Sequence, residues 1–188
     1  MSRKVKIINR KLVYNGYFNL EEVTFRHTTF AGVLSRPIER MVLDVGEIAA
    51  GLIVKREERR VVLVEQFRLP VLEHDDGWLI EVVAGRVDPG ETAEQAFRRE
   101  TLEEAGYKVE NVQQIHRFYP ASGTLVEHMT LFCAEAGSQL NNGGGTDDDE
   151  DIRVFEWSYD EFFSAIDRGE IVDAKTIIAG QWLRLNQA

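Results

Sequence analysis

Two glutamates one helical turn apart, Glu100 and Glu104, are the side chains whose type and spacing point most directly to chemistry. They lie in a segment from Ala93 to Ala105 that is rich in helix-forming residues. At about 100° per residue, both carboxylates fall on the same side of this helix as Phe97. A surface helix turns its apolar side toward the protein interior, so two like charges are directed inward. Such a pair is destabilising unless a cation neutralises it.

The ligand types favour Mg²⁺ or Mn²⁺ over zinc, because they are carboxylate oxygens without neighbouring histidine or cysteine. The four histidines form no HExxH pattern. Mg²⁺ in turn favours phosphate chemistry, in which metal ions bridge substrate oxygens and activate water. An alternative interpretation needs no metal: Glu100 and Glu104 only pair with arginines such as Arg98 and Arg99. The helical periodicity leaves both interpretations open.

The helix that carries these glutamates has clear start and stop signals. Pro89-Gly90 breaks the chain, and the sequence from Thr92 to Gln95 has the form of a capping box. Gly106 stands where a C-terminal glycine belongs. The pattern therefore predicts a helix over residues 93–105.

Short runs of β-branched and aromatic residues predict strands on both sides of this helix. A charged hairpin connection is expected at residues 55–60, and two helices are expected at 159–168 and 174–185. Together these elements predict an α/β (or α+β) sandwich, with a small N-terminal β-unit at residues 1–45 and the main domain at 46–188. The expected strands cover residues 5–8, 17–25, 41–43, 49–54, 61–67, 78–83, 113–118, 128–134 and 152–157.

Composition and charge exclude several classes of function. The 188 residues carry a formal charge of −10, which disfavours general nucleic-acid binding. No apolar run approaches the ~20 residues that span a membrane, and the N-terminus lacks the apolar region of a signal peptide. The single cysteine, Cys133, lies in an apolar stretch and is expected to be a buried strand residue. We therefore expect a cytoplasmic protein.

The segment that begins at Gly85 resembles the Nudix box, G-x5-E-x7-R-E-U-x-E-E-x-G-U, in which U is a bulky apolar residue. The departures are Thr101 and Tyr107, which occupy the two U positions and concern packing rather than catalysis. The resemblance implies the Nudix fold, an α/β/α sandwich around a mixed sheet, with a divalent metal at the box helix. All seven fixed positions agree in identity and spacing: Gly85, Glu91, Arg99, Glu100, Glu103, Glu104 and Gly106.

Carried over by position, the resemblance implies that Glu100 and Glu104 are the main metal ligands and Glu103 a further or indirect one. Ala84 would contribute its backbone carbonyl to the metal. Mg²⁺ is the expected ion, with Mn²⁺ as a possible substitute.

The same resemblance implies supporting roles for three other residues of the box. Arg99 would orient the carboxylates by charge-assisted hydrogen bonds. Gly85 would let the loop turn tightly against the helix, and Glu91 would fix the loop rather than bind metal.

Beyond the box, the chain resembles the ADP-ribose and GDP-mannose pyrophosphatases of this family over nearly its whole length. Residues 61–68 resemble their VxLxxQFR strand, and residues 81–85 resemble the strand before their box. Residues 119–127 resemble their Y-x-S-P-G-x-x-x-E loop, although Ala121 and Ser122 replace its serine and proline. The C-terminal matches, at 149–152 and 169–176, are closest to the GDP-mannose group.

These matches imply Mg²⁺-dependent hydrolysis of the diphosphate bond of a nucleoside diphosphate sugar, which releases a nucleoside monophosphate and a sugar phosphate. Glu127 would contact substrate or act as general base, and Glu150 would be a distal metal ligand within the acidic run 147–151. Substrate contacts are implied for Arg68 and Lys175, and more weakly for Arg40 and Tyr17. The N-terminal unit implies a homodimer.

Each of these roles has a plainer alternative. The acidic run is otherwise a solvated loop. Tyr17 is otherwise a core residue, and Arg40 and Lys175 are otherwise ordinary surface charges. At the level of function, the alternatives are a hydrolase specific for ADP-ribose or ADP-sugars, and a Nudix-fold binding module that has lost catalysis. An RNA substrate is disfavoured by the negative charge.

Overall fold

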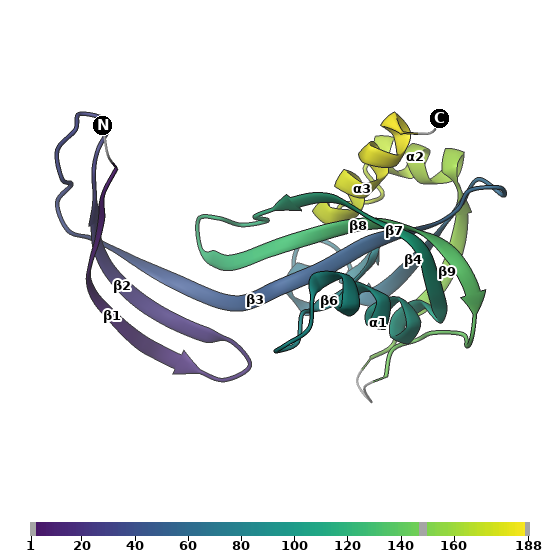
Figure 1. Ribbon diagram of the computed structural model, residues 1–188, viewed down its shortest axis with the longest axis horizontal. Helices are drawn as coiled ribbons and strands as arrows, with labels where there is room; N and C mark the ends of the chain where they lie inside the picture. The colour runs from purple at the N-terminus through teal and green to yellow at the C-terminus, as the bar shows by residue number, and fades with distance from the viewer. Residues whose placement is uncertain (1–2, 147–149, 187–188) are drawn as a thin grey trace. The chain divides into compact units, whose positions relative to one another are not determined.

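The computed structural model describes residues 3–146 and 150–186 and divides into two compact units (Figure 1). The first unit comprises Met1–Gly46 with Tyr119–His128, and the second comprises Glu47–Phe118 with Met129–Ala188. Each unit is described by itself below.

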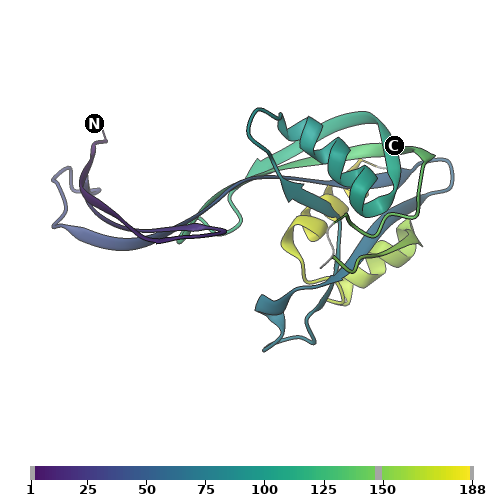
Figure 2. The ribbon, with the colours of Figure 1, turned by 90° about the horizontal axis from the view of Figure 1, so that it is seen from below.

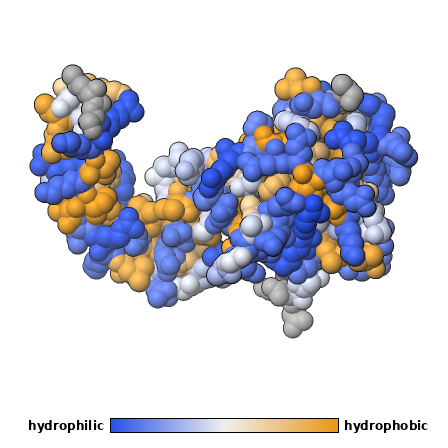
Figure 3. Space-filling view, in the orientation of Figure 1, coloured by the Kyte–Doolittle hydropathy of each residue, from blue (hydrophilic) through white to orange (hydrophobic). Residues whose placement is uncertain are grey.

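The first unit is built on antiparallel strands. Strand β1 (Val5–Asn15) pairs with β2 (Asn19–His27), which pairs with the first part of β3 (Ile38–Lys55). The segment Tyr119–His128 is tied to β3 by a hydrogen bond from the Leu43 backbone nitrogen to the Thr124 carbonyl, 3.0 Å long. Every residue of β1 is exposed. Apolar surface is therefore visible over these strands (Figure 3).

Strand β3 continues into the second unit without interruption. The expectation of separate strands at 41–43 and 49–54 was wrong, because the chain passes through Gly46 without ending the strand. Gly46 has a φ of 84°, which a residue without a Cβ adopts at little cost. Its backbone nitrogen donates to the Asp44 carboxylate at 3.1 Å. The strand therefore continues through this positive-φ glycine.

The sheet of the second unit surrounds the second part of β3. Strand β3 pairs with β4 (Arg60–Phe67), β6 (Val83–Arg86) and β8 (Leu125–Gln139). Strand β4 also pairs with β5 (Trp78–Glu81) and β9 (Arg153–Ser158), while β7 (Tyr107–Phe118) pairs with β8. The single strand expected at 78–83 is thus two strands. The chain leaves β4 after Glu81 and joins β3 at Val83.

Helices cover both faces of this sheet (Figure 2). Helix α1 (Ala93–Ala105) belongs to one buried apolar cluster, and helices α2 (Tyr159–Asp167) and α3 (Ala174–Leu185) belong to the other. A short 3-10 helix, η1, covers Leu69–Val71. The α/β/α sandwich and all three predicted helices are confirmed. Within residues 3–146 and 150–186, no helix has the length and apolar content needed to cross a membrane.

One aromatic contact fixes helix α1 on the sheet. The rings of Phe97 and Phe132 stack with centroids 5.3 Å apart and 10° between their planes. Phe97 is fully buried and lies directly over Gly51 of β3. A Cβ at position 51 would lie 2.5 Å from the Phe97 ring, so only glycine lets the helix approach this closely. The side of the helix that carries Phe97 also carries Glu100 and Glu104.

Candidate active site

Local interactions define the helix that carries the glutamates. The Thr92 side chain accepts from the Gln95 backbone nitrogen, and the Gln95 side chain accepts from the Thr92 backbone nitrogen. These two bonds satisfy two helix donors that would otherwise lack partners. At the other end Gly106 adopts the left-handed conformation with a φ of 77°. The capping box and the glycine stop predicted from the sequence are both confirmed.

Glu104 is directed into the protein, as its helical position predicts. The residue is 5% exposed, and its Oε2 accepts from the Ala84 backbone nitrogen at 3.2 Å. Burial raises the pKa of its carboxyl to about 8, and the negative charge of Glu100 adds to this effect. A carboxyl whose pKa is strongly raised by burial and by a second carboxylate is typical of a functional site.

Glu100 lies against the loop that precedes the helix. A Cβ added to Gly85 would lie 1.8 Å from the Glu100 Oε1 atom, so the missing side chain makes room for this carboxylate. Burial raises the pKa of Glu100, and the charges of Glu103 and Glu150 raise it further. Hydrogen bonding to Arg99 acts in the opposite direction. Gly85 is therefore required because it leaves space for the Glu100 carboxylate, and not because its backbone adopts a positive φ.

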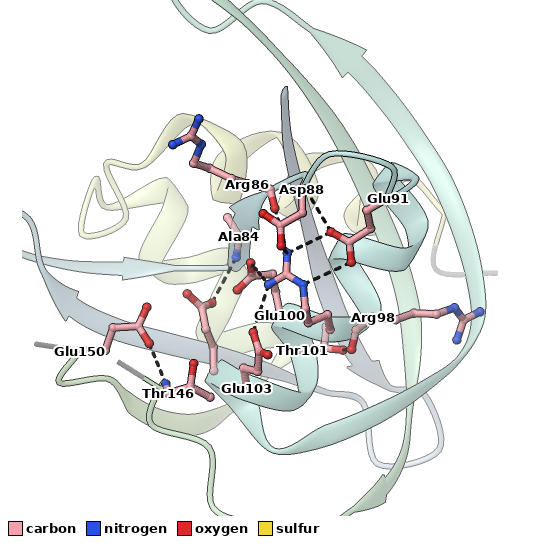
Figure 4. Close-up of polar contacts among 12 residues, drawn as sticks. Ala84, Arg86, Asp88, Glu91, Arg98, Glu100, Thr101, Glu103, Thr146 and Glu150 are labelled. Atoms are coloured by element: carbon pink, nitrogen blue, oxygen red, sulfur yellow. Dashed lines mark hydrogen bonds and ion pairs between the residues drawn. The ribbon is translucent and has the colours of Figure 1, made fainter. Parts of the chain in front are cut away.

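The carboxylates of Glu91, Glu100 and Glu103 converge on one guanidinium group (Figure 4). This group belongs to Arg99, which links the helix to the loop. Its Nη1 donates to Glu100 Oε1 at 2.6 Å and to Glu103 Oε2 at 3.1 Å. Its Nε and Nη2 donate to the two oxygens of Glu91, and Nη2 also donates to the Arg86 carbonyl. The pKa of Glu91 falls because of these bonds, and the pKa of Arg99 rises because of the acidic partners. Arg99 thus orients carboxylates from both the loop and the helix.

The purely structural interpretation of the glutamates holds for only one of the pair. Glu100 does pair with Arg99, whereas Arg98 pairs with Glu94 and with the Val109 carbonyl. For Glu104, the hydrogen bond described in this structure comes from a backbone nitrogen, not from an arginine. Among the described residues, the deeper of the two carboxylates therefore has no arginine as a hydrogen-bond donor, although the charge of Arg68 lowers its pKa.

Glu150 belongs to the same region. Its Oε2 accepts from the Thr146 backbone nitrogen at 2.8 Å, and Gly145 leaves room for its carboxylate. Its negative charge is one of the causes that raise the pKa of Glu100. The preceding acidic residues, 147–149, lie outside the described part of the chain.

These residues fit a hard divalent cation by their chemistry. The donors are carboxylates, one of them buried without a cationic hydrogen-bond partner among the described contacts, and a glycine leaves space beside them. Among residues 3–146 and 150–186, however, no three acidic, histidine or cysteine side chains converge as in an assembled metal cluster. The guanidinium of Arg99 instead supplies the positive charge that Glu100 and Glu103 share.

Arg68 and Lys175, the expected substrate contacts of this unit, meet at an acid that the sequence analysis did not single out. Glu81 accepts from Arg68 Nε at 2.9 Å and from the Lys175 ammonium group. Glu81 is buried, and it follows the apolar residues Leu79 and Ile80 in β5. The sequence signal that could have revealed Glu81 is a single acidic residue at the end of an otherwise apolar strand.

The remaining expected site residues, Glu127, Arg40 and Tyr17, belong to the first unit. Glu127 lies near the start of β8 and is half-buried. Arg40 lies on β3 opposite Val23 and donates to the Glu39 carbonyl. Tyr17 is 72% exposed at the turn between β1 and β2, so the alternative of a core residue does not hold within this unit. Their roles at the site stay predictions.

The two departures from the box pattern are accommodated by hydrogen bonds. Thr101 is fully buried, and its hydroxyl donates to the Arg98 carbonyl. The Tyr107 hydroxyl donates to Glu156 at 3.1 Å. Both replacements for aliphatic residues therefore keep their polar atoms paired. Cys133 is buried, and burial raises the pKa of its thiol to about 11, as expected for a structural cysteine.

The raised pKa of Glu104 predicts a pH-dependent stability difference. Its folded pKa of about 8 exceeds the usual 4.5, so the stability it contributes is fully present below pH 4.5 and is lost as pH rises through 8. With a chelator present, Glu104→Gln should therefore unfold at a higher temperature than the wild type at pH 9. The difference should reach a few kcal/mol, since each pKa unit is worth about 1.4 kcal/mol.

Thermal unfolding of both proteins at pH 5, 7 and 9 checks this expectation. Glu94→Gln is the matched control, because Glu94 is exposed on the same helix and pairs with Arg98. A difference between Glu104→Gln and wild type that is the same at all three pH values would contradict the buried, protonated carboxyl.

Comparison with known proteins agrees with this geometry. Residues 46–180 match the NUDIX domain. A curated protein named ADP-ribose pyrophosphatase, from Escherichia coli (strain K12), is 34% identical over 185 residues, which cover 97% of this chain and 88% of that protein. One named GDP-mannose pyrophosphatase, from Cronobacter sakazakii, is 38% identical over 189 residues, which cover 98% of this chain and 97% of that protein.

A solved structure described as an ADP compounds hydrolase shares the fold, with a TM-score of 0.76 and 18% sequence identity. The superposition covers 98% of this chain and 97% of that one. The domain match extends over most of the chain, includes the helix with the paired glutamates and is supported by full-length relatives. The chain therefore belongs to the Nudix family of hydrolases.

Proposed function

We propose that this enzyme hydrolyses the diphosphate bond of a nucleoside diphosphate sugar of the GDP-mannose or ADP-ribose type. The products are a nucleoside monophosphate and a sugar phosphate. The observation that carries the proposal is the buried carboxylate of Glu104 beside Glu100, inside a Nudix box whose fixed positions are all present. The names of the full-length relatives supply the substrate class.

Nudix pyrophosphatases are in general divalent-metal dependent, and we propose Mg²⁺ for this one, with Mn²⁺ as a substitute. Glu100, Glu104 and Glu150 would hold it, together with the Ala84 carbonyl, and Glu103 would contribute indirectly. When bound, the cation neutralises the diphosphate and favours attack by water. This local positive charge lets a chain with a net charge of −10 take an anionic substrate.

The other proposed roles belong to side chains that bind, orient or move a proton. Arg99 holds Glu100 and Glu103 in place through its bonds to both. Arg68 and Lys175 contact the phosphates of the substrate. Glu127 takes a proton from the attacking water, as a positioned carboxylate can.

From the N-terminal unit we propose further contacts to the substrate by Arg40 and Tyr17. A site of action in the cytoplasm suits the buried free thiol of Cys133.

The nearest alternative activity is hydrolysis restricted to ADP-ribose or ADP-sugars, since some of the relatives are named ADP-ribose pyrophosphatase. A binding module without catalysis is disfavoured because every glutamate of the box is present.

A substrate panel tests the proposed reaction. Purified protein with Mg²⁺ is incubated separately with GDP-mannose, ADP-ribose, ADP-glucose and UDP-glucose, and chromatography detects the nucleoside monophosphate. The wild type should release it, and Glu104→Gln should be slower by at least about a hundredfold, the usual loss when a main charge-stabilising group is removed.

Glu94→Gln should stay within about twofold of the wild type, because that exposed acid pairs with Arg98 outside the carboxylate cluster. The fastest substrate separates the guanosine from the adenosine alternative. Absence of product from every substrate, with Mg²⁺ or Mn²⁺, would contradict the proposed function.

We also propose that the enzyme is a homodimer held by its N-terminal unit. All of β1 is exposed, including the apolar side chains of Ile7, Leu12 and Val13, each about half exposed. Exposed apolar surface of this kind is typical of a protein interface. A second copy of the same strands is the proposed partner.

Sedimentation equilibrium tests the dimer. The wild type should have twice the 21.5 kDa mass of the chain, and Leu12→Asp with Val13→Asp should shift it to one chain mass. The mass should stay dimeric when Leu185, an exposed apolar residue of α3, is changed to Asp. A wild type with the mass of one chain would contradict the proposal.

A further inference from the structure

A largely buried ion-pair network of the second unit lies beside the carboxylate cluster and is centred on Glu81. Glu81 ends strand β5 and is 3% exposed. Its two oxygens accept from two different elements: Oε2 from Arg68, which follows β4, and Oε1 from Lys175 in α3. Lys175 is itself 8% exposed and also donates to Asp173 Oδ1 at 3.0 Å. The positive charges of Arg68 and Lys175 are therefore balanced by two carboxylates in a largely buried space. The carboxylates are those of Glu81 and Asp173.

This network differs from a surface ion pair in what it can do. Exposed pairs contribute little and hold no fixed geometry. A buried charge needs partners in a defined arrangement, because a missing partner leaves an uncompensated charge away from water. Glu81 thus fixes where the guanidinium and the ammonium lie.

The pairing with Glu81 leaves binding capacity on both cations. A guanidinium has five N–H donors, and the described contact to Glu81 uses the one at Nε. The Arg68 side chain is 40% exposed, so it is open to a ligand. An ammonium group has three donors, and Glu81 and Asp173 take two of them.

The same short stretch of chain connects this network to the glutamates of the box. The Val82 backbone nitrogen donates to Thr176 Oγ1 at 2.8 Å, which attaches the start of α3 to the residue after Glu81. Two residues further on, the Ala84 backbone nitrogen donates to Glu104 Oε2. The four residues from Glu81 to Ala84 therefore carry both the acid that holds the basic pair and the backbone nitrogen that binds Glu104.

We propose that Glu81 is a positioning residue, which holds Arg68 and Lys175 beside the box glutamates so that both cations meet the phosphate oxygens of the substrate. The inference rests on the proposed function, since it assigns the basic pair to phosphate binding. Glu81 itself would not touch the substrate, because both of its oxygens are engaged by the cations.

Steady-state kinetics of Glu81→Gln, on the fastest nucleotide sugar of the panel, tests this role. The amide keeps the volume of the side chain but loses the charge that holds both cations. KM should rise by about tenfold or more while kcat changes by less than about threefold, the pattern of a lost uniform binding interaction. Thermal unfolding of the same variant reports its folding separately.

Glu156 offers a matched control in the same unit. Its carboxylate also accepts from one lysine and one arginine, Lys55 and Arg60, neither of which belongs to the carboxylate site. Glu156→Gln therefore makes the same chemical change in the same type of ion-pair network. Its KM should stay within about twofold of the wild type, the range of a substitution outside the site. Equal KM changes in Glu81→Gln and Glu156→Gln would overturn the positioning role.

A double-variant cycle shows whether Glu81 acts through Arg68. If it does, Glu81→Gln should raise KM much less in an Arg68→Ala background than in the wild type, because coupled residues are not additive. Equal fold-changes in the two backgrounds would overturn the inference.

Should Glu81→Gln fail to fold, a second comparison is available. The double variant Glu81→Gln with Lys175→Met removes both charges, and its KM is compared with that of Lys175→Met alone. A KM no higher in the double variant would then overturn the inference.

The two proposals fail in different ways. A wild type that hydrolyses no nucleotide sugar overturns the proposed function and this inference together. An active wild type with an unaffected KM in folded Glu81→Gln overturns this inference alone.

Discussion

The structure depends on keeping two carboxylates on the inner side of one helix. Glu100 and Glu104 share that side of α1 with Phe97, whose ring stacks on Phe132. The apolar contact holds the helix against the sheet, and the helix in turn holds the carboxylates away from water. Burial raises the pKa of both carboxyls, most strongly that of Glu104. The core therefore stabilises an arrangement that electrostatics alone would oppose.

Neighbouring elements accommodate this unfavourable placement in three ways. Gly85 provides space for the Glu100 carboxylate, and Gly51 lets the helix approach the sheet. Arg99 donates to Glu100 and Glu103 from one side and to Glu91 from the other. Strand β6 supplies the backbone nitrogen that binds Glu104. Apart from Gly51, these residues lie within the box or directly before it, which is why this part of the site is encoded in a compact sequence motif.

The sequence predicted the helix, its two ends and the inward direction of the glutamates, because each depends on spacing within about four turns. It did not reveal the continuous β3 strand, since a glycine with positive φ looks like a break when only local propensity is considered. Glu81 was also missed as a partner of Arg68 and Lys175. Those residues are 13 and 94 positions away in sequence, and only the fold brings them together.

The central claim is that the inward carboxylates of α1 form a divalent-cation site. Calorimetric titration of Mg²⁺ into wild type, Glu104→Gln and Glu94→Gln proteins at pH 8 tests it most directly. We predict that the wild type and Glu94→Gln bind Mg²⁺ with the same affinity, whereas Glu104→Gln binds it at least about tenfold more weakly, as loss of a ligand charge requires. Equal affinities in all three proteins, or no binding to the wild type, would contradict the account.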